Sequence, residues 1–307
     1  MKNKYEEISV MKKKIVMLLT VAMICAGVTA CGSTKESSNA EGGSVAIEDE
    51  EAPQAEDADS ASETSGEAVY VEGTKEDFDF AEISDSELAL TKYHGDAEYL
   101  IIPDNFSGRE IVKVSGFSGK VNLKGVVIPD TVKTIGDRAF NGCENLETVT
   151  LGNGVETIDE AAFINCDSLS FVNLPDSITY IGEMAFDGNN IKELHIPTGL
   201  SEIMSGAFTN GKFSTVTIPG NIKVIGYQAM AANDELKTVY IEDGVEEIEY
   251  EVFDDCPQLE ELHIPASVTT FGDDFIVDKT DILTIYAPEG SAAEEYAHSN
   301  DINFVAE

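Results

Sequence analysis

One unit of 22 or 23 residues repeats along the sequence from residue 128 to near the C-terminus. Each copy opens with Ile or Leu, usually followed by Pro, and the openings are Ile128, Leu151, Leu174, Ile196, Ile218, Ile241 and Ile264. A fixed period of this length is typical of a solenoid, in which each copy forms one coil and covers the flank of the next. The repeat therefore predicts a stack of similar coils.

The apolar positions of the unit predict two short extended segments in each coil. The pattern L-x-x-V-x-[IL], as in residues 146–151, puts alternate side chains on one face, which is the period of a β-strand. A second pair, such as Val132 and Ile135, predicts a return segment on the opposite side, and Ala139-Phe140 predicts a turn whose ring fills the interior. One unit buries too little apolar surface to offset the entropy of ordering its backbone, so neighbouring coils must stabilise one another.

The column three residues after each Phe exchanges Cys with Asn: Cys143, Cys166, Asn189, Gly211, Asn233 and Cys256. Cys or Asn at such a turn satisfies buried backbone groups, so these thiols are predicted to be structural. Cys143 and Cys166 lie on adjacent coils, about 4.8 Å apart at strand spacing, and a disulfide between them is left open. The glycine after the return segment is predicted to be a turn preference only, since Met204 and Glu249 share its column.

Both ends of the repeat region are predicted to be caps. Residues 88–93 and 99–102 flank a turn-like His-Gly-Asp and predict a hairpin over the first coil. Ser291-Ala292-Ala293-Glu294 predicts the start of a helix that runs to about residue 298, after which Ile302 and Phe304 return to the core. Caps are needed because an open solenoid end exposes sheet edge and apolar surface.

The first thirty residues have the anatomy of an export signal. Three lysines at 12–14 precede an uncharged segment at 15–30 that ends in small residues. Val28-Thr29-Ala30-Cys31 resembles the lipobox of bacterial lipoproteins, which implies lipidation of Cys31. An uncleaved signal anchor is the competing interpretation, and the start at Met1 or Met11 is open. The predicted organisation is a signal peptide at 1–30, an acidic disordered tether at 31–78, an N-terminal cap with a degenerate repeat at 79–127, repeats at 128–284 and a C-terminal cap at 285–307.

The charge of the chain limits its partners. With 19 basic and 58 acidic residues the formal net charge is -39, and no basic patch follows the first 14 residues. Phosphate neutralisation needs clustered Lys and Arg, so nucleic acid is not an expected partner, and contact with a membrane is expected only through the lipid anchor. The excess of acid also fits a solvated surface that keeps the protein soluble.

No arrangement of a nucleophile, an acid and a base is visible. None of the cysteines lies beside a histidine in repeat register. His195 and His263 share an outward column three coils apart, about 14 Å at strand spacing, which is too far for one zinc ion. We therefore predict no catalytic residues, no metal site and no cofactor.

The outward positions of the predicted strands are the ones left free to vary. Most hold Thr, Glu or Asn, whereas Phe171, His195, Tyr240 and His263 carry large rings. Exposed rings of this kind can anchor a partner, because they contribute contact area at little entropic cost. Scattered exposed aromatics are also ordinary, and this alternative stays open.

The repeat spelling I-P-x-x-V-x-x-I-G-x-x-A-F-x-x-C-x-x-L-x-x-V resembles the BspA-like leucine-rich repeat family of bacterial surface proteins, over about residues 100–290. Residues 285–291, followed by Tyr296-Ala297, resemble its C-terminal cap. The resemblance implies a leucine-rich-repeat solenoid, β-rich with a parallel sheet and short turns or helical segments, capped at both ends. It also implies an extracytoplasmic, non-enzymatic binding or adhesion module for protein or glycan partners. The alternatives are a structural envelope scaffold and an accessory subunit of an envelope enzyme.

Overall fold

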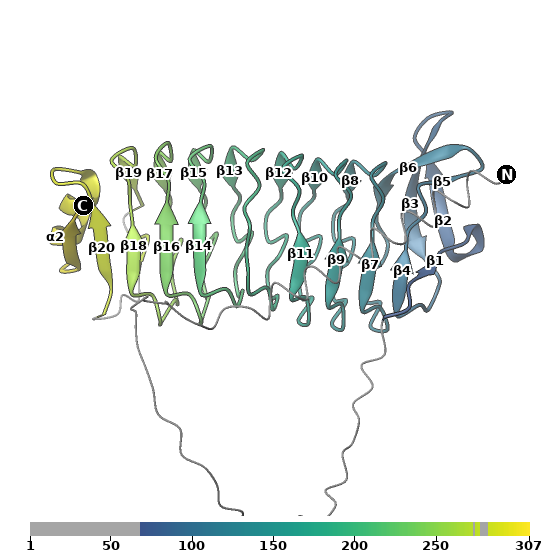
Figure 1. The fold of residues 1–307 in the computed structure, drawn as a ribbon, viewed down its shortest axis with the longest axis horizontal. Coiled ribbons are helices and arrows are strands. Elements are labelled where there is room, and N and C mark those ends of the chain that lie inside the picture. Colours follow the sequence, from purple (N-terminus) through teal and green to yellow (C-terminus); the bar gives the residue numbers. More distant parts are fainter. Residues whose placement is uncertain (1–67, 273, 277–281) are drawn as a thin grey trace, which may run out of the picture. The chain divides into compact units, whose positions relative to one another are not determined.

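The computed structural model describes residues 68–272, 274–276 and 282–307. Within them, successive repeats form coils that stack side by side, and most coils contribute one strand to each of two opposite faces (Figure 1). The strands of neighbouring coils pair in parallel, so the predicted solenoid is confirmed. The predicted signal peptide, Cys31 and the predicted tether up to residue 67 lie outside the described residues.

The strands formed by the L-x-x-V-x-[IL] pattern make two sheets on one face, which we call sheets A and D. Sheet A consists of β1 (Val71–Glu72), β4 (Tyr99–Ile101), β7 (Gly125–Val127), β9 (Thr148–Thr150) and β11 (Phe171–Asn173). Sheet D consists of β14 (Thr215–Ile218), β16 (Thr238–Ile241), β18 (Glu261–His263), β20 (Thr284–Ala287) and β21 (Asn303–Ala306).

The return segments make sheets B and C on the opposite face. Sheet B consists of β2 (Phe78–Glu82), β3 (Glu87–Tyr93), β6 (Arg109–Val114), β8 (Thr134–Ile135), β10 (Thr157–Ile158) and β12 (Tyr180–Ile181), with β5 (Asn105–Phe106) paired to β6. Sheet C consists of β13 (Glu202–Ile203), β15 (Val224–Ile225), β17 (Glu247–Ile248) and β19 (Thr270–Phe271).

The N-terminal residues are arranged differently from the predicted hairpin. β3 pairs antiparallel with β2 and parallel with β6, whereas β4 joins β1 and β7 on the other face. The hairpin prediction was wrong because β3 and β4 already follow the alternation of the coils, one strand to each face. Residues 71–78, placed in the predicted tether, form β1, the short 3-10 helix η1 (Lys75–Asp77) and the start of β2, where Phe78 is buried.

The C-terminal residues form the predicted helix and return to the core. Helix α2 (Ala292–Ser299) begins after Ser291, whose hydroxyl accepts a hydrogen bond from the Glu294 amide at 3.3 Å. The Glu294 carboxylate reaches back to the Gly290 amide rather than to Ser291, at 2.6 Å. Ile302 is buried, and β21 extends sheet D. Among the described residues, no helix combines the length and the apolar character needed to cross a membrane.

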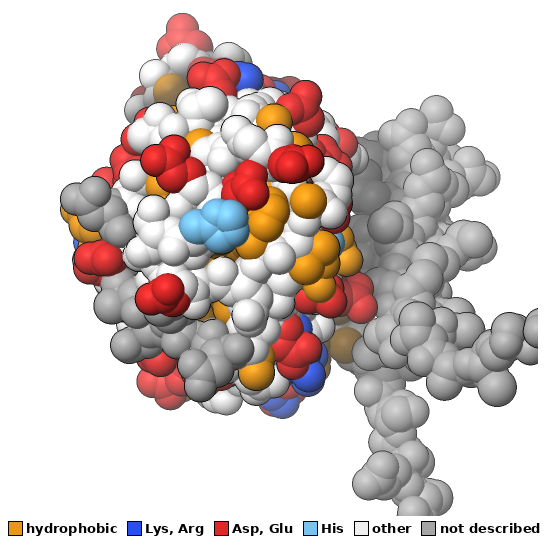
Figure 2. Space-filling view, turned by 90° about the vertical axis from the view of Figure 1, so that its left-hand side faces the viewer, with side chains coloured by type: hydrophobic (Ala, Val, Ile, Leu, Met, Phe, Trp, Pro, Cys, Tyr) orange, Lys and Arg blue, Asp and Glu red, His pale blue; other side chains and the backbone are white. Residues whose placement is uncertain are grey.

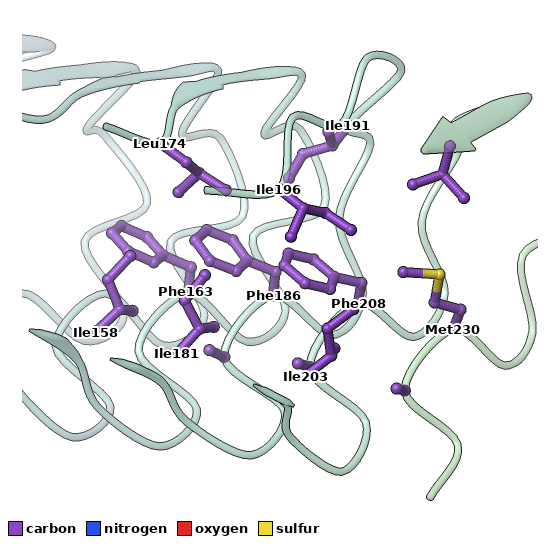
Figure 3. Packing of buried hydrophobic residues seen from close by; sticks show 14 of the residues in the cluster. Ile158, Phe163, Leu174, Ile181, Phe186, Ile191, Ile196, Ile203, Phe208 and Met230 are labelled. Carbon is purple, nitrogen blue, oxygen red and sulfur yellow. The ribbon is translucent and has the colours of Figure 1, made fainter. Parts of the chain in front are cut away.

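A row of phenylalanine rings runs through the interior of the coils. The rings of Phe117, Phe140, Phe163 and Phe186 stack with centroids 4.8, 5.1 and 5.2 Å apart, and Phe208 follows at 5.7 Å. Met230 takes the position of the ring in the next coil (Figure 3). The stacked rings fill the middle of the coils from Phe117 to Phe208, as the Ala-Phe turns predicted.

The sheets are interrupted in the middle of the stack. Sheet A ends at β11 and sheet D begins at β14, and sheets B and C are likewise separate (Figure 1). The strand predicted at residues 193–195 does not form. The units that open at Leu174 and Ile196 are one residue shorter than their neighbours, because Ile191 follows Asn189 by two residues where Leu169 follows Cys166 by three. The shorter turn alone does not decide the outcome, because the same turn precedes β14, which forms and pairs with β16.

Asn173, the last residue of β11, adds side-chain bonds to the preceding coil. Its side-chain oxygen accepts from the Leu151 amide at 2.7 Å, and its side-chain nitrogen donates to the Leu151 carbonyl at 2.9 Å. Leu151 directly follows β9, so these bonds reinforce the pairing of β9 with β11 on the side away from the interruption.

The predicted glycine column is not left-handed, since Gly136, Gly182, Gly226 and Gly272 are absent from the positive-φ residues. Two other columns do have a left-handed backbone with positive φ. One precedes each Ala-Phe turn and contains Arg138, Ala161, Met184, Gly206, Gln228 and Glu251; the other lies two residues after the ring and contains Gly142, Asn165, Gly188, Asn210, Ala232 and Asp255. The tight turns of every coil are therefore built from two left-handed residues, although most of them are not glycine.

Candidate functional site: the outward face of sheet D

The outward face of sheet D carries two rows of side chains. Its strands pair in register, so equivalent residues form columns that cross the sheet. The polar row is Thr215, Thr238, Glu261, Thr284 and Asn303, and the second row is Thr217, Tyr240, His263, Tyr286 and Val305. Short side chains surround the three rings, which makes the rings the prominent feature of this face.

Tyr240, His263 and Tyr286 form one continuous stack. The ring centroids of Tyr240 and His263 are 4.5 Å apart with planes 23° apart, and those of His263 and Tyr286 are 4.6 Å apart with planes 13° apart. Tyr286 was not among the predicted site residues. Its signal was present, because it follows Ile285 as Tyr240 follows Val239, but the residues around it had been assigned to the cap.

Two carboxylates flank the middle ring of this stack. Nδ1 of His263 lies 3.2 Å from Oε1 of Glu307, and Nε2 lies 3.9 Å from Oε2 of Glu261. The His263 side chain is 20% exposed, because Tyr240 and Tyr286 cover its two faces. The stack is therefore held in place from the faces by rings and from the edge by acidic groups.

The other two predicted site residues do not join this stack. Phe171 is 38% exposed in β11, next to Thr148, at the end of sheet A and beyond the interruption. His195 lies in the coil without a strand and is exposed, with Nε2 3.7 Å from Oδ1 of Asp176. The structure thus brings Tyr240 and His263 together. Phe171 and His195 lie apart from this pair and from each other.

Asp176 is held mainly by a threonine rather than by His195. The amide and hydroxyl of Thr198 donate to its Oδ1 at 3.0 and 2.9 Å, and these two bonds are the main reason why the pKa of Asp176 is lowered. His195 adds a smaller effect of the same sign. The exposed pair is a contact between neighbouring coils and offers no enclosed site.

On sheet A the corresponding face is covered by Tyr70. Its ring lies 5.3 Å from that of Tyr99, and its hydroxyl is 3.3 Å from that of Thr148, so the side chain crosses Gly125. A Cβ at Gly125 would lie 2.7 Å from the Tyr70 hydroxyl, so only glycine leaves room for it. Burial raises the pKa of Tyr70 above its ordinary value. Sheet A therefore has less free outward surface than sheet D.

The described cysteines are not nucleophiles. Cys143, Cys166 and Cys256 are buried and free. Burial raises the pKa of Cys143 to about 11 and that of Cys256 to about 12, so both thiols are protonated at neutral pH. The disulfide left open between Cys143 and Cys166 is absent. Within the described part of the chain, no group of His, Cys, Asp and Glu is placed to hold a metal ion.

Comparison with known structures finds similar bacterial repeat proteins. A leucine-rich repeat protein of T. pallidum is 27% identical, with a TM-score of 0.49 over 66% of this chain and 86% of that one. A leucine-rich cell surface protein of Faecalibacterium prausnitzii is 22% identical, with a TM-score of 0.46 over 71% of this chain and 76% of that one. No curated protein matches the chain.

A family model covers more than half of the chain. The BspA type leucine-rich repeat region, in six copies, matches residues 110–234 and 156–283. The matched residues include the coils of both halves and most of sheet D. The chain therefore belongs to the BspA-type leucine-rich repeat family.

Proposed function

We propose that this protein is an extracytoplasmic, lipid-anchored binding module without enzymatic activity, and that its partner docks on the outward face of sheet D. The observation that carries the proposal is the Tyr240–His263–Tyr286 stack, a rigid aromatic feature on a face where the other side chains are short. Binding energy at interfaces is concentrated in such rigid rings. The family, the protonated buried thiols and the lipobox at Cys31 support the same conclusion.

Site-specific crosslinking tests where the partner docks. A diazirine amino acid replaces Thr238, which faces outward beside the stack, in the full-length protein expressed in bacterial cells. The matched control replaces Thr157, which faces outward on sheet B. We expect an adduct with a protein or glycan from position 238 and none from position 157. Adducts from both positions with envelope components only would support a scaffold, and an adduct from 157 alone would place the site elsewhere.

A separate experiment tests the anchor. Cys31→Ala removes the thiol that the lipobox offers for acylation, so the variant should lose lipid labelling and leave the membrane fraction. Cys25→Ala is the control, because Cys25 lies outside the lipobox. If Cys31→Ala stays membrane-bound and labelled, Cys31 is not the residue that carries the lipid. Protease treatment of intact cells then shows whether the repeats lie outside the cytoplasmic membrane.

A further inference from the structure

We propose that the open face of Tyr240 binds an arginine side chain of a protein partner. The inference rests on the proposed function, since it names the chemistry that the outward face of sheet D recognises. It follows from the direction of the stacked rings, from the small residue beside Tyr240 and from a carboxylate on the same side.

The rings of the stack present their faces along the row of strands. Their centroids repeat at 4.5 and 4.6 Å, close to the spacing of neighbouring strands, and their planes are nearly parallel. Both faces of His263 are therefore covered, and the stack shows mainly ring edges to solvent. A sugar ring, which packs flat on an aromatic face, finds no broad platform here. The faces left over are the two ends of the stack.

The two ends differ. At one end the column continues with Val305, the register partner of Tyr286, and the Tyr286 side chain is only partly exposed. At the other end it continues with Thr217, which is exposed and, like Val305, much smaller than a ring. Tyr240 is accordingly 41% exposed. A planar group placed over Thr217 would extend the stack by one member at the strand spacing.

A carboxylate lies on this open side. Glu242 follows Tyr240 by two residues and is exposed. Its Oε2 accepts a hydrogen bond from the Gly220 amide at 3.2 Å, so the side chain leans toward the coil that contains Thr217. An arginine guanidinium is planar and cationic, and it both stacks on a ring and pairs with a carboxylate. A lysine ammonium can pair with Glu242 but cannot stack.

The surrounding charge favours a basic partner. Residues 218–307 contain 21 Asp and Glu, three Lys and no Arg. Figure 2 looks onto the C-terminal end and shows acidic side chains scattered over it, with Lys and Arg only near its margin. Such a field attracts basic segments from a distance, and the Tyr240 step then selects arginine among them.

Three labelled peptides separate stacking from charge. The full-length protein in detergent is titrated with hexa-arginine, hexa-lysine and hexa-citrulline, and binding is followed by fluorescence anisotropy. We expect hexa-arginine to bind about five- to tenfold more tightly than hexa-lysine, because a stacked guanidinium gains more on the ring than an ammonium does. Citrulline, planar but uncharged, should bind weakly. Equal Kd values for the arginine and lysine peptides would overturn the proposal.

Variants locate the site. Tyr240→Leu removes the flat ring, and Thr217→Leu fills the step with a side chain that offers no flat face, so both should abolish the arginine preference. Tyr240→Phe should keep it, and Phe171→Leu is the control for a ring exposed on sheet A. A preference that survives Tyr240→Leu and Thr217→Leu would place it elsewhere. If the preference is absent although Thr238 still crosslinks a partner in cells, the arginine site fails and the proposed function stands.

Discussion

At the scale of single residues, the Cys and Asn column serves as a ladder of hydrogen-bond donors. Each side chain reaches the carbonyl of the ring position in the preceding coil, at 3.1–3.4 Å. The pairs are Cys143 with Phe117, Cys166 with Phe140, Asn189 with Phe163, Asn233 with Phe208 and Cys256 with Met230. The prediction that these side chains satisfy buried backbone groups is confirmed. Thiol and amide alternate because both can donate to that carbonyl.

Gly211 is the exception in this column, and size explains it. A Cβ at Gly211 would lie 2.6 Å from the Phe213 ring. Phe213 occupies a column that elsewhere holds Leu or Ile. The larger ring of Phe213 fills the space that a side chain at position 211 would occupy. The smaller volume at Gly211 is therefore matched by a larger volume at Phe213. This exchange involves residues of one coil and could not be recognised from either column alone.

Asn233 provides a direct test of the ladder. Its amide nitrogen donates to the carbonyls of Phe208 and Met230, at 3.1 and 2.6 Å, and the residue is fully buried. Asn233→Ala should lower the free energy of unfolding by about 3 kcal/mol, because buried carbonyls lose their donor. Asn233→Cys, which restores the donor used at Cys256, should cost about 1 kcal/mol. Urea unfolding measures both, and equal losses would contradict a role for the donor.

The buried thiols predict loss of stability at high pH. Burial raises the pKa of Cys256 from 9.0 to about 12. Below about pH 9 the thiol is protonated in both states; above it, the unfolded chain loses the proton first, so the free energy of unfolding falls as the pH rises toward 12. Cys256→Asn supplies an amide donor that does not titrate.

The measurement for this prediction is the melting temperature between pH 8 and 11. The free energy of unfolding derived from the melting curves should fall less steeply with pH in Cys256→Asn than in the parent. The slopes should differ by up to about 1 kcal/mol per pH unit. Tyrosines with raised pKa, such as Tyr296 at about 12, contribute equally to both proteins. Parallel curves for parent and variant would exclude Cys256 as a source of the decline.

The left-handed turn columns show what residue patterns can and cannot reveal. The column of Gly142, Asn165, Gly188, Asn210, Ala232 and Asp255 is rich in Gly, Asn and Asp, the residues that tolerate positive φ, so it was detectable. The column of Arg138, Ala161, Met184, Gly206, Gln228 and Glu251 has no such composition. There the packing of the coils imposes the conformation against local preference.

At the scale of elements, the repeat pattern predicted one strand that does not form, at residues 193–195, where the repeat length changes. The spelling of residues 191–196 fits a strand as well as that of 146–151 does. The turn before it is one residue shorter, but the turn before β14 is shortened in the same way and β14 still forms. A strand needs the right side-chain pattern and the right register with both neighbours. Only the first can be seen within one unit.

Hydrogen exchange should reveal the interruption. Among the described residues, the amides of 193–196 donate no hydrogen bond, whereas β9 and β16 pair with a strand on each side. We expect residues 193–196 to exchange much faster than residues 148–150 and 238–241, because local opening is not needed. Peptide-resolved mass spectrometry measures the rates. Equal protection of the three segments would mean that a continuous sheet forms in solution.

The candidate site was predictable in part for the same reason. Tyr240 and His263 occupy one outward column in two adjacent regular units, so their contact follows from the register. His195 and Phe171 occupy outward positions too, but the coils between them and Tyr240 include the interruption. Tyr286 was missed because it falls within the predicted C-terminal cap at 285–307. Site residues are therefore found reliably only between neighbouring regular units.

At the scale of the whole molecule, the interruption divides the sheets but not the core. The stack of rings passes from Phe186 to Phe208 at 5.7 Å, with planes 6° apart (Figure 3). Main-chain bonds continue there on the side of the Ala-Phe turns, where the Phe186 amide donates to Ala207. In a solenoid, cooperativity depends on the interfaces between neighbouring coils. The coils on either side of the interruption are therefore joined by the bonds of the Ala-Phe turns, by the bond from the Lys212 amide to the Ile191 carbonyl and by side-chain packing.

This arrangement predicts which cavity uncouples the halves. Phe208→Ala removes the ring at the interruption, where packing replaces the sheet contacts, and Phe163→Ala removes a ring between coils that are also joined by sheets A and B. Each change should cost about 3–5 kcal/mol locally. In Phe208→Ala, residues 148–150 and 238–241 should lose protection at different urea concentrations, whereas in Phe163→Ala they should lose it together. Hydrogen exchange at increasing urea follows both segments in the same sample, and a single transition in Phe208→Ala would show that the main-chain bonds across the interruption alone couple the two halves.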